Sequence, residues 1–283
     1  MTFAPPAFCG GSRIKGNKND CAETTSSLIF LKGVGVLVDL FGFKLDKKQG
    51  LFLALFTLAA LVAQQLNFSA MVMPFGVAES PAFTVFQFFG AIAGSFLGVV
   101  GIAVILAAEL ANAAINTLLL HKAVGAWTLF GLLPMLFAAW YFSQNKENAK
   151  TGILVPLAAI ALFLLNPVGA QAWYFAAIFW SVPIIAKLFF ADNLLAKSLG
   201  ATMTAHAVGG SIWIWVFPTT AAYWAALIPT VIFERSMFAL GIALSFVAMT
   251  TVLHYATTKS RHAAAFAQLL HLDAKYALFA RAH

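Results

Sequence analysis

Charged residues are scarce in this chain and almost absent from two long stretches of it. Only 10% of the residues are Asp, Glu, Lys or Arg, whereas 61% are hydrophobic. The charges within residues 51–122 and 198–258 are Glu79, Glu109, Lys122, Glu234 and Arg235. Because a soluble protein of this length needs far more charge to cover its surface, the composition predicts an integral membrane protein.

Cysteine is rare as well, and the signatures of several enzyme classes are missing. The two cysteines, Cys9 and Cys21, lie in the N-terminal tail and are too few for a metal site. The first residues lack the apolar core and cleavage site of a signal peptide. Without a His-Glu-x-x-His, Gly-x-Ser-x-Gly or Walker motif, we expect no enzyme, cofactor or metal.

The net charge of +7 does not indicate nucleic acid binding. Its Lys and Arg residues lie in the tails and short loops, where anionic lipid accounts for them. The apolar runs are long rather than alternating, which favours transmembrane helices over a β-barrel. We therefore expect the lipid bilayer to be the main macromolecular environment of the chain.

The hydropathy pattern predicts an all-α, polytopic transmembrane bundle of six to eight spans. A break is expected near Gly98 and Gly101, because the apolar run there is too long for one helix. Two starts stay open for the last span: Ser236, if Pro229 divides the run, or the region of Trp224. The expected helices cover residues 50–68, 83–99, 101–120, 125–143, 151–165, 170–190, 198–217 and 224–257.

The composition divides the chain into four parts. Residues 1–27 read as a disordered tail, 28–48 as an interfacial amphipathic segment, 49–258 as the transmembrane domain, and 259–283 as a cytoplasmic amphipathic tail. All the loop lysines except Lys122 then fall on one side, which predicts a multi-pass plasma membrane protein with both termini cytoplasmic. Those lysines are Lys146, Lys150, Lys187, Lys197 and Lys259.

Polar residues gather in the outer half of the expected bundle. Glu109, Asn112 and Asn116 share one face of the third helix, because their offsets of three and seven match the helical repeat. Gln64 and Asn166 are expected at the same depth. Two interpretations stay open for the amides, namely hydrogen bonds that hold helices together and contacts to a ligand.

Three further polar residues lie in the last two expected spans. His206 has glycines at 209 and 210, which would let a helix or a ligand approach closely, although a core histidine bonded to a neighbour fits as well. Glu234 and Arg235 are adjacent and are not expected to pair on one helix face. They either cap the last helix or are buried, where Arg235 could bind an anionic group.

Three stretches resemble the substrate-binding S component of energy-coupling factor vitamin transporters. They are LALFTLAALVAQQLN at 53–67, MVMPFGVAESPAFTVF at 71–86 and FFGAIAGSFLGVVGIAVILAAEL at 88–110. The resemblance implies capture of a vitamin-like solute at the outer face. It also implies docking of Ala59 and Ala63 on a transmembrane coupling subunit driven by two ATPases. The chain departs from the family in its length and its N-terminal extension.

We therefore expect a membrane protein that captures a small polar solute at its extracytoplasmic side. The expected ligands are Gln64, Glu109, Asn112, Asn116, Asn166, His206, Glu234 and Arg235, under a lid at residues 71–83. Two alternatives remain. One is a membrane-embedded enzyme or redox subunit that uses Glu109 and His206 for proton transfer. The other is a structural scaffold whose polar residues only hold helices together.

Overall fold

The computed structural model describes residues 47–66, 84–119, 121, 130–145, 147–259 and 270–278. These residues form helices and no β-strand, which confirms the all-α prediction. The two cysteines, the expected lid at 71–83, and most of both predicted tails lie outside the described residues.

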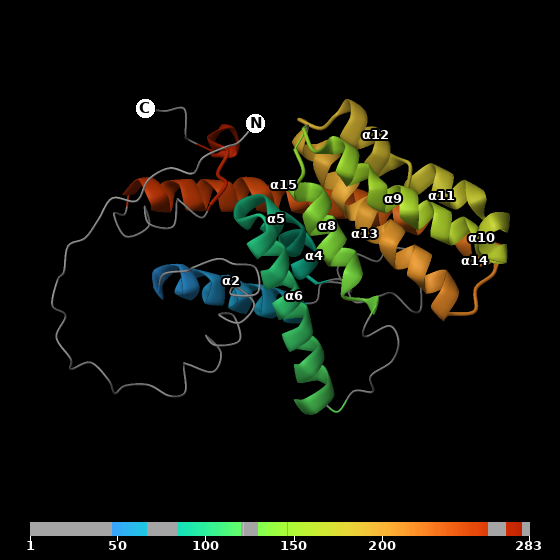
Figure 1. Ribbon diagram of the computed structural model, residues 1–283, viewed down its shortest axis with the longest axis horizontal. Helices are drawn as coiled ribbons and strands as arrows, with labels where there is room; N and C mark the ends of the chain where they lie inside the picture. The colour runs from blue at the N-terminus through green and yellow to red at the C-terminus, as the bar shows by residue number, and fades with distance from the viewer. Residues whose placement is uncertain are drawn as a thin grey trace, which may run out of the picture.

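Each of the eight expected segments is mainly helical in its described part, but residues 170–190, expected as one helix, are divided among α10, α11 and α12 (Figure 1). The first half contains α2 (Lys47–Gln65), α4 (Phe86–Phe89), α5 (Ala93–Leu97), α6 (Val99–Ala114) with a π-helical end (Ile115–Leu119), and α8 (Leu133–Ser143). The second half contains α9 (Ala149–Leu164), α10 (Pro167–Gln171), α11 (Trp173–Phe179), α12 (Val182–Phe189), α13 (Leu194–Val216), α14 (Ala221–Ala226) and α15 (Ile228–Lys259). A 3-10 turn, η3, follows at Ala274–Tyr276.

The expected break between the second and third segments falls at Gly98. Its φ of 58° and ψ of −137° are open only to glycine, so the chain turns there and α6 starts at Val99. A Cβ on Gly94 would lie 2.6 Å from the carbonyl oxygen of Ala139. This glycine therefore lets α5 pack closely on α8 within the chain.

The last helix starts between the two positions that the sequence left open. The chain breaks at Leu227, and α15 then runs for 32 residues from Ile228, with Pro229 in its first turn. Proline is tolerated there because the first-turn N–H groups have no partner within the helix. Of the two alternatives, the start at Ser236 is therefore wrong, and residues 234–235 lie inside α15.

Contacts between loops bring several helix ends together. At one end of α13, Tyr276 Oη near η3 donates to the carbonyl of Asp192 at 3.3 Å, and Lys187 Nζ of α12 donates to the carbonyl of Gln144, which follows α8, at 3.1 Å. At the other end, Trp215 Nε1 of α13 donates to the carbonyl of Leu162 in α9 at 3.1 Å. In Figure 1 the helices fan out: α15 lies across the view, α6 descends steeply, and α13 runs between these directions.

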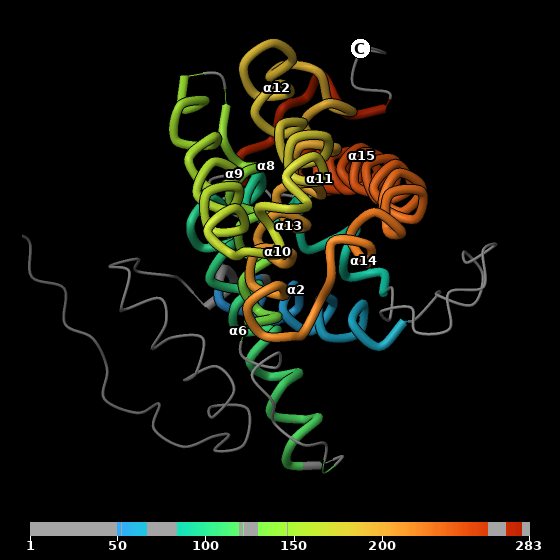
Figure 2. Tube along the Cα trace, turned by 90° about the vertical axis from the view of Figure 1, so that its right-hand side faces the viewer, coloured from blue at the N-terminus to red at the C-terminus, as the bar shows by residue number. Residues whose placement is uncertain are grey.

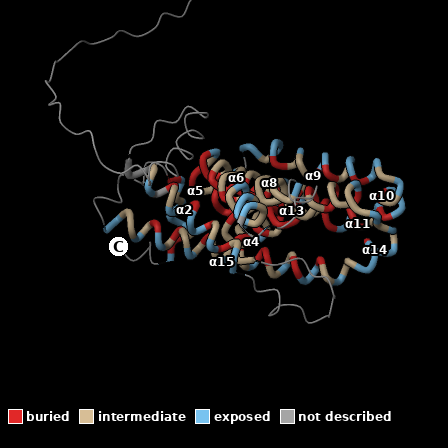
Figure 3. Tube along the Cα trace, turned by 90° about the horizontal axis from the view of Figure 1, so that it is seen from below, coloured by how far each residue is buried: buried red, intermediate tan, exposed pale blue. Residues whose placement is uncertain are grey.

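The buried side chains form two cores, and buried residues lie along the inner faces of the helices (Figure 3). The first core joins α2, α4, α5, α6 and α8 to Ile242 and Phe246 of α15. The second core joins α9, α11 and the C-terminal half of α13 to Trp224 and Val231. Helices α13 and α15 contribute to both cores, so they tie the two halves together.

Much of the outer surface is apolar. Leu165 and Phe189 are each 74% exposed, and Leu244 is 69% exposed. In the described part of the chain, two helices are long and apolar enough to cross a bilayer, Val99–Leu118 and Ile228–Lys259, while the other apolar helices are shorter. Both observations indicate a membrane protein. The number of spans and the location of the termini stay predictions.

Candidate functional site

The residues predicted to form one ligand site lie in three separate places. Helix α6 packs against α2, α5 and α8, whereas α13 and α15 pack against each other. In Figures 1 and 2 the C-terminal half of α6 extends away from the other helices. The structure therefore does not bring the polar face of α6 together with His206, Glu234 and Arg235.

The first group joins the C-terminal ends of α2 and α6. Gln65 Nε2 donates to Asn112 Oδ1 at 2.9 Å, and Asn116 Nδ2 donates to the carbonyl of Asn112 at 2.9 Å. Both amide atoms of Gln64 are buried and have no hydrogen-bond partner among the described residues. Glu109, on α6, is half-buried. The bonds between the two helices are those expected of polar contacts that hold a bundle together.

Asn166 forms the second group by itself. Its Oδ1 accepts from the backbone N–H of Val168 at 2.9 Å, and its Nδ2 donates to the carbonyl of Ile214 at 3.2 Å. The side chain thus caps α10 and fastens it to the end of α13. Both polar ends are used by the backbone, which gives Asn166 a structural role.

The third group, which we name the α13–α15 cluster, contains Ser198, Thr202 and His206 of α13 with Glu234 and Arg235 of α15. Arg235 Nη1 donates to Thr202 Oγ1 at 3.2 Å, and Nη2 pairs with Glu234 Oε2 at 3.3 Å. The expectation that the adjacent residues could not pair is wrong, because the long guanidinium side chain reaches back to its neighbour. The side chains of Glu234 and Arg235 are only 7% and 16% exposed.

His206 lies in an aromatic surrounding on the same helix face. Trp180 Nε1 donates to His206 Nδ1 at 3.3 Å, which requires Nδ1 to accept and places the proton of a neutral ring on Nε2. The rings of Phe175 and Phe179 lie 5.7 Å and 6.2 Å from the imidazole. A Cβ on Gly210 would lie 2.7 Å from the indole of Trp180. The glycine therefore makes room for Trp180.

Two buried polar atoms of the α13–α15 cluster are unused. Ser198 Oγ and Arg235 Nε have no hydrogen-bond partner among the described residues, and Ser198 is fully buried. A buried polar group without a partner costs about 1–3 kcal/mol, so structures retain few of them. The guanidinium also lies 5.1 Å from the ring of Phe238. The cluster therefore contains polar atoms, in apolar surroundings, whose hydrogen-bonding capacity no described residue uses.

The cluster occupies the boundary between the two cores. On α13, Thr202 lies between Ala201 of the first core and Met203 of the second. On α15, Glu234 and Arg235 follow Val231 of the second core and precede Ile242 of the first. The polar side chains thus lie where neither core is continuous.

Lys187 is a buried polar residue that the sequence analysis assigned to a cytoplasmic loop. It belongs to α12 instead and is 2% exposed. Its Nζ donates to the carbonyls of Tyr141 and Gln144 at 3.0 Å and 3.1 Å and lies 4.1 Å from the centre of the Tyr141 ring. The only sequence signal was its position inside the apolar run of residues 182–190. Lys187 caps the C-terminal end of α8.

Of the two alanines predicted to dock a partner, only one is accessible. Ala63 packs in the first core and is 7% exposed, whereas Ala59 is exposed on the outer face of α2. Leu55, Leu58 and Val62 lie on the same face and are each more than half exposed. A partner that docks on α2 would therefore contact this face, which includes Ala59 but not Ala63.

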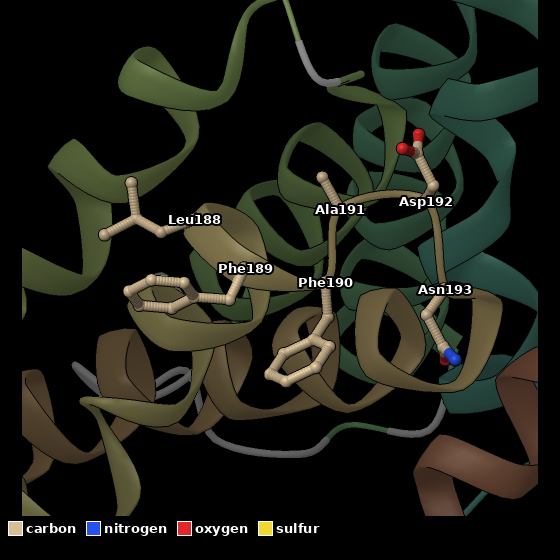
Figure 4. A pocket seen from close by; sticks show the side chains of 6 residues that line it. All are labelled: Leu188, Phe189, Phe190, Ala191, Asp192 and Asn193. Carbon is tan, nitrogen blue, oxygen red and sulfur yellow. The ribbon is translucent and has the colours of Figure 1, made fainter.

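A surface hollow of about 260 Å³ lies elsewhere, at the turn between α12 and α13. Its lining is one continuous stretch, Leu188–Asn193, and in Figure 4 these side chains splay away from one another. Because it brings no separate elements together, this hollow is a weaker candidate for a binding site than the α13–α15 cluster.

No known protein family, curated protein or solved structure matches the chain. The described residues also contain no group of three His, Cys, Asp or Glu side chains that could hold a metal ion. Evidence about function therefore comes from the geometry of the clusters.

Proposed function

We propose that this protein is a multi-pass plasma membrane protein that binds a small polar solute within its helical bundle and takes part in its uptake. The observation that carries the proposal is the Glu234–Arg235 pair, buried between α13 and α15 and bonded to Thr202. Charged residues inside membrane domains are costly and commonly mark the pathways of substrates or protons.

A purely structural role explains this cluster less well than it explains the other two groups. The amides of α2 and α6 bond to each other, and Asn166 bonds to backbone groups at both ends. Buried atoms without a partner occur on Gln64 at the end of α2 as well as in the α13–α15 cluster, but in the cluster one of them, Arg235 Nε, belongs to a buried charge pair. An unused donor on a buried charge is available to bind a polar solute.

The alternative of a proton-transferring enzyme has less geometric support. It requires Glu109 and His206 to act on one substrate, yet they lie on α6 and α13, which both pack on α8 but have no extensive contact with each other. General acid–base partners must lie within hydrogen-bond reach of the same reacting group. The solute-binding proposal needs no contact between these two residues.

An S-component-like arrangement, in which partner ATPases energise uptake through a coupling subunit, belongs to the same proposal. Its support is the resemblance of residues 53–110 together with the exposed apolar face of α2 around Ala59. A coupling subunit would pack on that face through small and branched side chains.

The test is native mass spectrometry of the protein purified in mild detergent. The proposal predicts a bound small molecule that is released on unfolding, and its loss in the Arg235→Gln variant. Glu147→Gln, which removes an exposed charge, serves as the matched control and keeps the molecule. Wild-type protein that carries no solute, and whose unfolding temperature no solute raises, would contradict the proposal.

A further inference from the structure

The geometry points to a small carboxylate as the ligand of the α13–α15 cluster, bound to Arg235 in exchange for Glu234, which takes up one proton. This inference rests on the proposed function and names its substrate class. The ligand carboxylate would replace a carboxylate that already lies 3.3 Å from the guanidinium, so the site has the chemistry that the ligand requires.

Charge balance is the first argument. Arg235 and Glu234 together are neutral, and both side chains are almost entirely buried. A second anion beside them would leave a net negative charge in apolar surroundings, which is strongly unfavourable. If a proton from water forms an O–H bond on the Glu234 carboxylate, its ion pair with Arg235 breaks and the ligand carboxylate forms a new one. The cluster is neutral before and after.

The donor arrangement is the second argument. A guanidinium has five N–H groups, and two of its nitrogens serve Thr202 and Glu234, whereas Nε has no hydrogen-bond partner among the described residues. Once Glu234 is released, the edge formed by Nε and Nη2 is free. That edge matches a carboxylate with two parallel hydrogen bonds, and Thr202 holds Nη1 in place.

Access and the surrounding groups complete the argument. Arg235 keeps 16% of its side chain exposed, but its Nε atom is buried, so a ligand reaches the edge formed by Nε and Nη2 only as the Glu234 side chain moves away. The groups that face it are Thr202 and His206 from α13 and the Phe238 ring from α15. His206 is the other titratable group of the cluster, so the experiment has to separate it from Glu234.

The experiment measures binding of acetate, propionate and benzoate to the full chain in detergent, from about pH 5 to about pH 8. Coupling to one proton makes the affinity fall about tenfold for each unit of rising pH. Calorimetry in buffers of different ionisation enthalpy should show one proton taken up per carboxylate. Propionamide and benzamide, which carry no charge, should show no such pH dependence.

Variants identify the proton acceptor. Glu234→Gln should bind the same carboxylates with no pH dependence and no proton uptake, whereas His206→Gln should keep both. Glu234→Gln with Arg235→Gln stays neutral, which protects the fold, and should lose binding altogether. The exposed Glu147→Gln should behave as wild type.

The outcomes separate this inference from the proposed function. Carboxylate binding that is independent of pH but lost in Arg235→Gln overturns the proton exchange and leaves solute binding at the cluster intact. Binding that survives Arg235→Gln contradicts both proposals. Pronounced pH dependence in Glu234→Gln overturns the proton exchange. A bound molecule without an acidic group, found by mass spectrometry, supports the proposed function and refutes the carboxylate.

Discussion

Replacing Lys187 by Met should destabilise the protein, although it removes a buried charge. Lys187 Nζ bonds to two carbonyls at the end of α8, of which that of Tyr141 is buried and that of Gln144 is partly buried. After the substitution the Gln144 carbonyl recovers water, whereas the buried Tyr141 carbonyl keeps only its bond from the backbone N–H of Gln144 at 3.2 Å. Loss of a hydrogen bond to a charged group costs about 1.5–3 kcal/mol. Relief of the desolvation of the ammonium is the opposing effect.

We expect the lost interactions to outweigh the relief of desolvation, because the ammonium is stabilised by the carbonyl end of α8 and by the Tyr141 ring at 4.1 Å. The net loss should be about 1–3 kcal/mol, which corresponds to a fall in Tm of about 3–10 °C for a chain of this size. Thermal unfolding in detergent measures it, with the exposed Lys150→Met as control. A Lys187→Met protein as stable as wild type would refute the capping role.

Three further predictions test the fold. Gly98→Ala should lose about 1–3 kcal/mol because its backbone conformation suits only glycine, whereas Gly50→Ala, in open space within α2, should gain about 0.5–1 kcal/mol. Gly94→Ala should lose about 1–3 kcal/mol, since its Cβ would meet a carbonyl oxygen of α8 at 2.6 Å. Cysteines at Asn145 and Asp192, in a background without the native cysteines, should be labelled by an impermeant reagent from the same side of the membrane.

Each of these predictions has a result that counts against it. Equal unfolding temperatures for Gly98→Ala and Gly50→Ala would contradict the claim that the backbone conformation at position 98 suits only glycine. An unchanged unfolding temperature for Gly94→Ala would mean that α5 and α8 are not in close contact. Labelling of positions 145 and 192 from opposite sides would show that the two loops do not share one end of the molecule.

The helix positions could be predicted from the sequence because they depend on local properties. Long apolar runs require helices in lipid, and a glycine pair marked the break that the structure places at Gly98. The start of α15 could not be predicted, because proline fits both the interior break and the first turn of a helix. In the structure Val231, two residues after Pro229, packs in the second core, and such a tertiary contact is not visible in the sequence pattern.

The candidate site was predicted in its residues but not in its arrangement. Depth along each helix places Glu109 and Arg235 in the same half of a bundle, but it does not say which helices are neighbours. Lys187 was missed because a lysine near a helix end is usually a loop residue, and its carbonyl partners lie more than 40 positions earlier in the chain. Such contacts follow from tertiary packing, which periodicity does not encode.

The two cores have a consequence for how the protein unfolds. The apolar contacts within each core are continuous, whereas at their boundary the helices α13 and α15 are joined by the bond between Thr202 and Arg235. Helix α13 also packs closely on α8 of the first half, so the two halves should unfold together in one cooperative transition. A ligand that binds at the boundary would contact residues beside both cores and raise the temperature of that single transition.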